Sequence, residues 1–63
     1  MKFELLDQHK DLITYLPEDP NLQKGSSVII QNEDWSVMHV EYHLETNTKK
    51  YVLALRDIKM KEI

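Results

Sequence analysis

The strongest constraint on the fold lies in residues 36–55, where apolar and polar side chains alternate along two runs on either side of Asn47. Side chains of a β-strand point to opposite faces with a period of two residues, so each run has one apolar and one polar face. Asparagine tolerates the positive φ that a two-residue hairpin loop requires. The segment therefore predicts an antiparallel hairpin that turns at Asn47-Thr48.

The register of this hairpin follows from matching its two apolar faces. The expected apolar pairs are Leu44 with Tyr51, Tyr42 with Leu53, and Val40 with Leu55. On the polar face the same register brings Glu45 opposite Lys50, an opposite-charge pair worth roughly 0.2–1 kcal/mol. It also pairs His39 with Arg56 and His43 with Val52. A slip of one residue would set apolar against polar side chains along the whole ladder. A loop of residues 46–49 gives the same register, so the turn type stays open.

Three further strands are expected before the hairpin, in residues 2–6, 12–16 and 27–31. Residues 5–16 also fit one stripe of an amphipathic helix that ends at Pro17, which leaves a helix over residues 4–16 as the alternative. Residues 17–25 predict a loop from which Leu22 returns to the core. The only glycine, Gly25, precedes the third strand and is expected to take positive φ.

These five short strands predict an all-β fold in a single domain, residues 1–63. The expected form is a small five-stranded barrel or a strongly bent sheet that ends in a three-stranded antiparallel meander. The layout resembles the SH3-like small barrels in its long second loop, glycine-led third strand, long fourth strand and tight last hairpin. This resemblance concerns architecture over most of the chain and implies no functional residue. The helical alternative predicts an α+β fold, with helix 4–16 packed on a three-stranded sheet.

Composition indicates where the protein acts. The chain has no cysteine, whereas small secreted domains usually depend on disulfides, so we expect a reducing, cytoplasmic compartment. No signal peptide is recognisable after Met1, and no apolar run approaches the roughly 20 residues of a membrane helix. The small size and the Lys-, Asn- and Ile-rich composition suggest an accessory protein of a bacterium or its phage.

No motif of catalysis or metal binding is recognisable in the chain. His39 and His43 share a strand face, but four residues of strand separate them by about 13 Å. One zinc ion cannot span that gap, because its histidine nitrogens lie about 2.0–2.1 Å from it. The single glycine rules out a Gly-rich phosphate loop. We therefore expect no enzyme, no catalytic residue, no metal and no cofactor.

The leading functional hypothesis is a non-enzymatic interaction module that binds a protein partner or self-associates. In the expected register Trp35 faces Met60, and Val37 faces Ile58, on the nominally polar side of the hairpin. Either the strand bends or bulges there and buries them, or they form an apolar patch of the kind found at interaction sites. The candidate partner-binding residues are Trp35, Val37, Ile58, Met60 and Tyr15. An exposed edge strand would add a second binding mode.

The alternative hypothesis is a nucleic-acid-binding small barrel. Residues 1–48 hold three lysines against nine acidic residues, whereas residues 49–63 hold five basic residues against two acidic ones. The residues that would contact phosphates are Lys49, Lys50, Arg56, Lys59 and Lys61. The net charge of −3 argues against this hypothesis, since nucleic-acid binders usually carry a stronger basic field.

Overall fold

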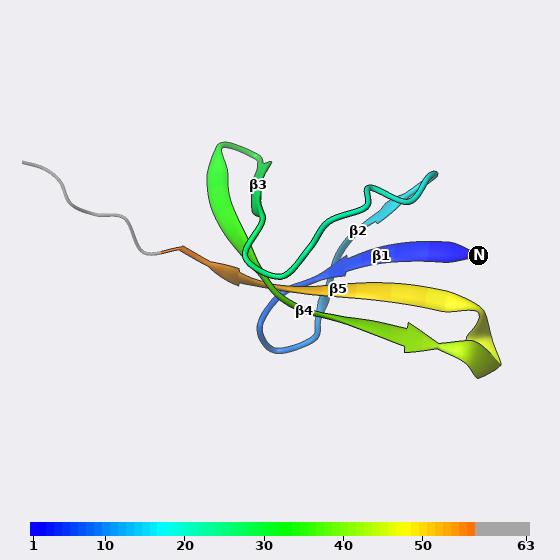
Figure 1. Ribbon diagram of the computed structural model, residues 1–63. Helices are drawn as coiled ribbons and strands as arrows, with labels where there is room; N and C mark the ends of the chain where they lie inside the picture. Colours follow the sequence, from blue (N-terminus) through cyan, green and yellow to red (C-terminus); the bar gives the residue numbers. More distant parts are fainter. Residues whose placement is uncertain (57–63) are drawn as a thin grey trace, which may run out of the picture.

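The computed structural model describes residues 1–56, which form one strongly curled sheet (Figure 1). Its strands are β1 (Lys2–Leu6), β2 (Leu12–Leu16), β3 (Ser27–Ile30), β4 (Glu33–His43) and β5 (Thr48–Leu55), and a 3₁₀ turn η1 (Leu44–Thr46) joins the last two. The strand order is β2-β1-β5-β4-β3, so β2 and β3 are the edges of a half-barrel. The prediction of an all-β, strongly bent sheet that ends in an antiparallel meander is confirmed.

The segment with two readings, residues 4–16, forms the antiparallel β1–β2 hairpin, so the helical alternative is wrong. Its turn is built around Asp7, whose Oδ1 accepts the backbone N–H groups of His9 and Asp11 at 2.8 and 3.0 Å. Lys10 takes φ of 66° and completes the turn. Asx turns of this kind favour a reversal of the chain over a continuing helix.

Strand β1 also pairs with β5, and this pairing is parallel. Leu5 lies beside Tyr51 and Leu6 beside Val52 in this ladder. The pairing makes β5 a central strand, which explains why Tyr51, Val52 and Leu53 are all at most 3% exposed. The sequence pattern did not predict this contact, because nothing within either strand specifies a partner so distant in the chain.

The hairpin of β4 and β5 exists, but its expected register is wrong by four residues. Val40 lies opposite Tyr51, and Tyr42 lies opposite Lys49. The chain turns earlier than expected, through η1, and Asn47 ends the turn with φ of 52° while its N–H donates to the carbonyl of Leu44 at 3.2 Å. Asparagine does supply the positive φ, but at the last position of the turn. Because four is an even number, the same faces of the two strands still point inward.

A second correction concerns the first half of β4. The β4–β5 register shifts between Val37 and His39, so Met38 is an extra residue in a β-bulge. Beyond the bulge Val37 lies opposite Leu53, and Trp35 lies opposite Leu55. Leu53 and Leu55 thus take the places expected for Ile58 and Met60, which lie outside the described residues. Met38, which alternates in step with the apolar residues Val40 and Tyr42, is 48% exposed.

The core lies on one face of the sheet, which we call the inner face. Its fully buried members are Leu5, Val37, Tyr51 and Leu53. Seven partly buried apolar residues pack against them, namely Ile13, Leu16, Leu22, Val28, Ile30, Trp35 and Val40. Leu22 comes from the loop of residues 17–25, as expected. On the opposite, outer face, Leu6 and Val52 are also buried, so both faces of β1 and β5 contribute to stability.

Two further turns match their sequence. Gly25 has φ of 91°, as expected, and its N–H donates to the carbonyl of Val37 at 2.8 Å. Gln31 and Asn32 both take positive φ and join Ile30 to Glu33 as a two-residue hairpin loop. Within residues 1–56 no helix has the length and apolar character needed to cross a membrane.

Candidate functional site

A partly buried ion pair on the inner face fastens the loop of residues 17–25 to β5. Lys49 is only 8% exposed, and its Nζ lies 2.8 Å from Oδ2 of Asp19. The hydroxyl of Tyr51 donates to the other carboxylate oxygen, Oδ1. The Lys49 ammonium also lies 5.2 Å from the ring centre of Tyr42 and 5.1 Å from that of Tyr51, both within cation–π range.

The protonation states of this cluster follow from its contacts. Hydrogen bonds from Lys49 and then Tyr51 lower the pKa of Asp19 from 3.8 to about 2. The pKa of Lys49 is raised above its ordinary value, chiefly because the ammonium donates to Asp19. Burial, and then the hydrogen bond to Asp19, raise the pKa of the Tyr51 hydroxyl. At neutral pH the lysine keeps its proton and has no free electron pair, so the cluster holds the loop in place and offers no nucleophile or general base.

A second cluster lies on the outer face around Glu41 of β4. Its Oε2 lies 2.9 Å from Lys10 Nζ and 2.9 Å from His39 Nε2, and its Oε1 lies 2.8 Å from His43 Nε2. Hydrogen bonds from Lys10, His43 and His39, in that order, lower the pKa of Glu41 from 4.5 to about 2. Lys10 belongs to the β1–β2 turn, so this contact reaches across β5.

The two histidines thus share one carboxylate. Each histidine directs its Nε2 at the Glu41 carboxylate. The three residues are two positions apart along β4, so their side chains are neighbours on the same face. Among the described residues, no group of three His, Cys, Asp or Glu side chains has the arrangement to hold a metal ion. The arrangement instead links the β1–β2 turn to the outer face.

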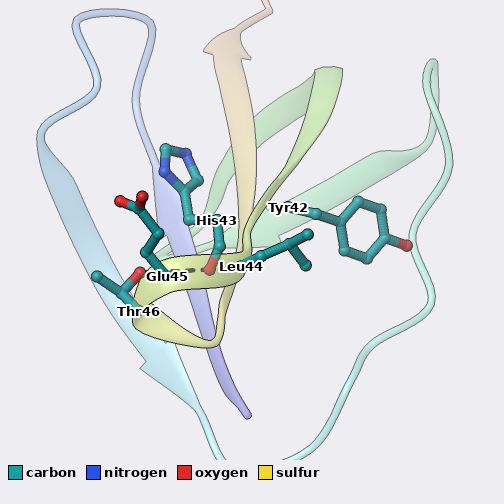
Figure 2. Close-up of a pocket in the computed structure, with 5 residues that line it drawn as sticks. All are labelled: Tyr42, His43, Leu44, Glu45 and Thr46. Carbon is teal, nitrogen blue, oxygen red and sulfur yellow. Dashed lines mark hydrogen bonds between the residues drawn. The ribbon is translucent and has the colours of Figure 1, made fainter.

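An open hollow lies at the end of the β4–β5 hairpin (Figure 2). Its volume is about 330 Å³, and its lining residues are Tyr42, His43, Leu44, Glu45 and Thr46. Figure 2 shows the side chains of Tyr42 and Leu44 on one side of the hairpin end and those of His43 and Glu45 on the other. Tyr42 is 61% exposed and Leu44 is 81% exposed. Two large apolar side chains therefore stand next to each other in solvent.

The local structure holds the Tyr42 ring and the backbone at Leu44. The Tyr42 ring contacts the Lys49 ammonium, as described above. Leu44 begins η1, whose turn is closed by the N–H of Asn47 and by the Thr46 hydroxyl, which donates to the carbonyl of His43 at 3.4 Å. The hollow is thus held in shape by contacts within the protein.

The structure separates the residues expected to form a patch around Trp35. Val37 is 2% exposed and belongs to the core, so its side chain offers no surface in this conformation. Trp35 is half-buried against the core, and its Nε1 is buried without a hydrogen-bond partner among the described residues. Tyr15 is 58% exposed on β2, at the opposite edge of the sheet from β3. Ile58 and Met60 lie outside the described residues.

The expected phosphate-contacting residues each have an acidic neighbour where the structure describes them. Lys49 pairs with Asp19, Lys50 Nζ lies 3.8 Å from Glu4 Oε1, and Arg56 Nε lies 3.8 Å from Asp34 Oδ2. Lys59 and Lys61 lie outside the described residues. No observation on residues 1–56 favours nucleic-acid binding, which stays a prediction.

Sequence reasoning missed the exposed pair of Tyr42 and Leu44, because the expected register buried both against β5. The signal that could have found them is Asn47. Had its positive φ been placed at the end of the turn, Leu44 would have fallen in the turn and not in the strand. The contact of Asp19 with Lys49 was also missed, because an acidic residue in a proline-flanked loop is usually a solvent-exposed residue that only aids solubility.

Comparison with known proteins adds no relative to this description. No family model, no curated protein and no solved structure matches the chain.

Proposed function

We propose that this protein is a non-enzymatic interaction module that binds a protein partner at the Tyr42–Leu44 surface. The observation that carries the proposal is the joint exposure of these two side chains beside one hollow. Single exposed apolar residues are common on proteins, but neighbouring ones around a concavity are typical of interaction sites. Aromatic residues are also enriched at the centres of such interfaces.

The folding free energy that the protein forgoes by leaving these side chains in solvent supports the proposal. A chain of this size buries only about 60% of its unfolded surface, so its core is short of apolar material. Burying a leucine would contribute about 1.5–3 kcal/mol to folding. Leu44 makes no such contribution at 81% exposed. A partner that covered Leu44 and Tyr42 would recover that free energy on binding.

The shape of the surface also suits binding. The Tyr42 ring lies over the Lys49 ammonium, and the closed turn fixes the backbone at Leu44, so little backbone entropy would be lost when a partner docks. His43 and Glu45 line the same hollow from the other side of the hairpin end, so polar side chains adjoin the apolar pair there. Protein interfaces usually combine an apolar centre with polar residues at its margin.

Three finer features belong to the proposal. The module acts in the cytoplasm, which the absence of cysteine supports. Its half-barrel is of the SH3-like kind, which the long second loop and the final meander support. The protein has an accessory role in a bacterium or its phage, which its small size supports.

The test is affinity capture from the native host with three forms of the protein: native, Leu44→Asp and Ile29→Asp. Ile29 is 66% exposed on β3, so its variant matches the charge change at a site away from the hollow. We expect one protein to be retained by the native and Ile29→Asp forms and to fall at least tenfold with Leu44→Asp. Equal retention by all three forms would contradict the proposal. Circular dichroism checks that both variants keep the strand content of the native protein.

A further inference from the structure

The cluster around Glu41 on the outer face gathers three hydrogen-bond donors on one carboxylate, and two of these donors can change their charge. Lys10 Nζ and His39 Nε2 both lie 2.9 Å from Oε2, and His43 Nε2 lies 2.8 Å from Oε1. Histidine is the side chain whose charge ordinarily changes between pH 5 and 8. The balance of charge around Glu41 therefore depends on pH.

With neutral histidines the charges of the cluster cancel. A neutral imidazole carries one N–H, and the hydrogen bonds to Glu41 assign that hydrogen to Nε2 in both rings. The pKa of Glu41 is lowered to about 2, so its carboxylate stays charged throughout the range in which histidine takes up a proton. One negative charge on Glu41 then faces one positive charge on Lys10.

Protonation of the histidines upsets this balance. The proton enters each ring at Nδ1, and the charged imidazolium then donates a stronger hydrogen bond to the carboxylate than the neutral ring does. The imidazolium of His39 also stands beside the Lys10 ammonium at the same carboxylate oxygen, and like charges repel at such a short separation. With both rings charged, three positive groups compete for one negative group.

Lys10 is the donor that can leave. His39 and His43 lie two residues on either side of Glu41 in β4, so the backbone of a paired strand keeps them near the carboxylate. Lys10 belongs to the β1–β2 turn and reaches Glu41 across β5 with a long, flexible side chain that is 57% exposed. Its ammonium can therefore turn into water without breaking any pairing of the sheet.

We propose that the Glu41 cluster is a pH-sensitive switch, in which protonation of His39 and His43 displaces Lys10 and detaches the β1–β2 turn from β4. The turn keeps its own hydrogen bonds to Asp7, so only its contact across β5 is lost. The outer face gains up to two positive charges at the same time. This inference goes beyond the proposed function and involves no partner.

The other charged and titratable groups around the cluster do not contact its imidazole rings. These groups are Lys2 and Glu4 of β1, Asp7, His9 and Asp11 of the β1–β2 turn, Lys50 of β5, and Glu45 of η1. Lys50 Nζ lies 3.8 Å from Glu4 Oε1. Within residues 1–56, Glu41 is the only acidic residue that pairs with either imidazole, so a proton on these rings acts through Glu41.

Nuclear magnetic resonance of the purified full chain tests the switch. Carbon-13 relaxation of the Lys10 ε-methylene measures how firmly the side chain is held, and the imidazole nitrogen signals report the protonation of each ring. We expect the order parameter of this methylene to fall at least twofold between about pH 8 and about pH 5.5, in step with the titration of His39 and His43. The ε-methylene of the exposed Lys24 should show no such change.

Glutamine variants supply the matched controls, because glutamine donates a hydrogen bond but cannot take up a proton. In a double variant with His39→Gln and His43→Gln, Lys10 should stay as ordered at about pH 5.5 as at about pH 8. His9→Gln should behave like the native protein, since His9 lies in the same turn but is no hydrogen-bond partner of Glu41. A native Lys10 that stays equally ordered across this range, or a double variant that loses order as the native does, would overturn the inference.

Thermodynamic linkage gives a second test, which leaves both histidines in place. If protonation of the rings displaces Lys10, then Lys10 must weaken their protonation by the same factor. Lys10→Met should therefore raise the proton affinity of His39 at least threefold, whereas Lys24→Met should leave it unchanged. An unchanged proton affinity in Lys10→Met would overturn the inference. Both experiments use the protein without a partner, so failure of this inference and failure of the proposed function are distinguishable.

Discussion

The Lys49 ammonium and the Asp19 carboxylate, thirty positions apart in the chain, lie 2.8 Å from each other on the inner face of the half-barrel. Asp19 belongs to the loop of residues 17–25, and Lys49 belongs to the central strand β5. The contact therefore fixes the one long loop of the described chain across the sheet. It also places the lysine beneath the Tyr42 ring, so it links the core to the proposed binding surface.

The lowered pKa of Asp19 predicts a loss of stability in acid. A carboxyl group whose pKa is lower in the folded state stabilises that state above the unfolded pKa, and the contribution disappears as pH falls through the folded pKa. The pKa of Asp19 drops from 3.8 to about 2. The free energy of unfolding should thus fall between about pH 4 and pH 2. Urea denaturation across this range measures it, and Asp19→Asn should be less stable at pH 7 and show a shallower pH dependence.

Glu41 predicts a separate acid-sensitive contribution on the outer face. Its pKa falls from 4.5 to about 2, so its stabilising effect is complete above about pH 5 and is lost towards pH 2. Glu41→Gln should flatten part of the pH dependence of the unfolding free energy while leaving the Asp19 part intact. If the Glu41→Gln and native proteins show the same pH dependence, the cluster of Lys10, His39 and His43 around Glu41 does not form in solution.

The bulge in β4 predicts opposite outcomes for two adjacent residues. Val37→Ala removes buried methyl groups from the core and should lower the free energy of unfolding by about 1.5–3 kcal/mol. Met38→Ala, at a 48% exposed position, should cost less than about 1 kcal/mol. Simple alternation along the strand, with Met38 inward, predicts the reverse order. Chemical denaturation of the two variants decides between them.

The left-handed conformation of Asn47 predicts how the β4–β5 turn responds to substitution. With φ of 52°, a β-branched residue is strained there, so Asn47→Val should destabilise the protein by about 1–3 kcal/mol. Asn47→Gly accepts positive φ without strain and should change stability by less than about 1 kcal/mol. Thermal unfolding of the two variants provides the measurement. Equal losses would show that Asn47 does not adopt this conformation.

The sequence was sufficient to predict the strands because their patterns are local. Alternation in β4 and β5, the β-favouring residues of β2, and positive φ at Gly25 and Asn47 are all properties of short segments. The inner face of β5, and that of β4 after the bulge at Met38, also followed from alternation alone, because a register error of four residues preserves which face points inward.

The features that the sequence could not predict depend on contacts distant in the chain. The parallel pairing of Leu5 with Tyr51 requires β1 to choose β5 as its neighbour, and no residue in either strand specifies that choice. The bulge at Met38 turns Val37 and Trp35 towards a core to which β1 and the loop also contribute, so its position depends on residues distant in the chain. The exposure of Leu44 follows from the four-residue shift in register, so the binding surface could not be located before the turn was known.

Site-specific photo-cross-linking tests the proposed function most directly. A benzophenone side chain replaces Leu44 in one form of the protein and Ile29 in another, and each form is irradiated in extract of the native host. The account predicts one discrete cross-linked adduct with a host protein at position 44, absent at position 29 and competed away by unlabelled native protein. The same adducts at both positions, or none at position 44, would contradict the claim that Tyr42 and Leu44 form a binding surface.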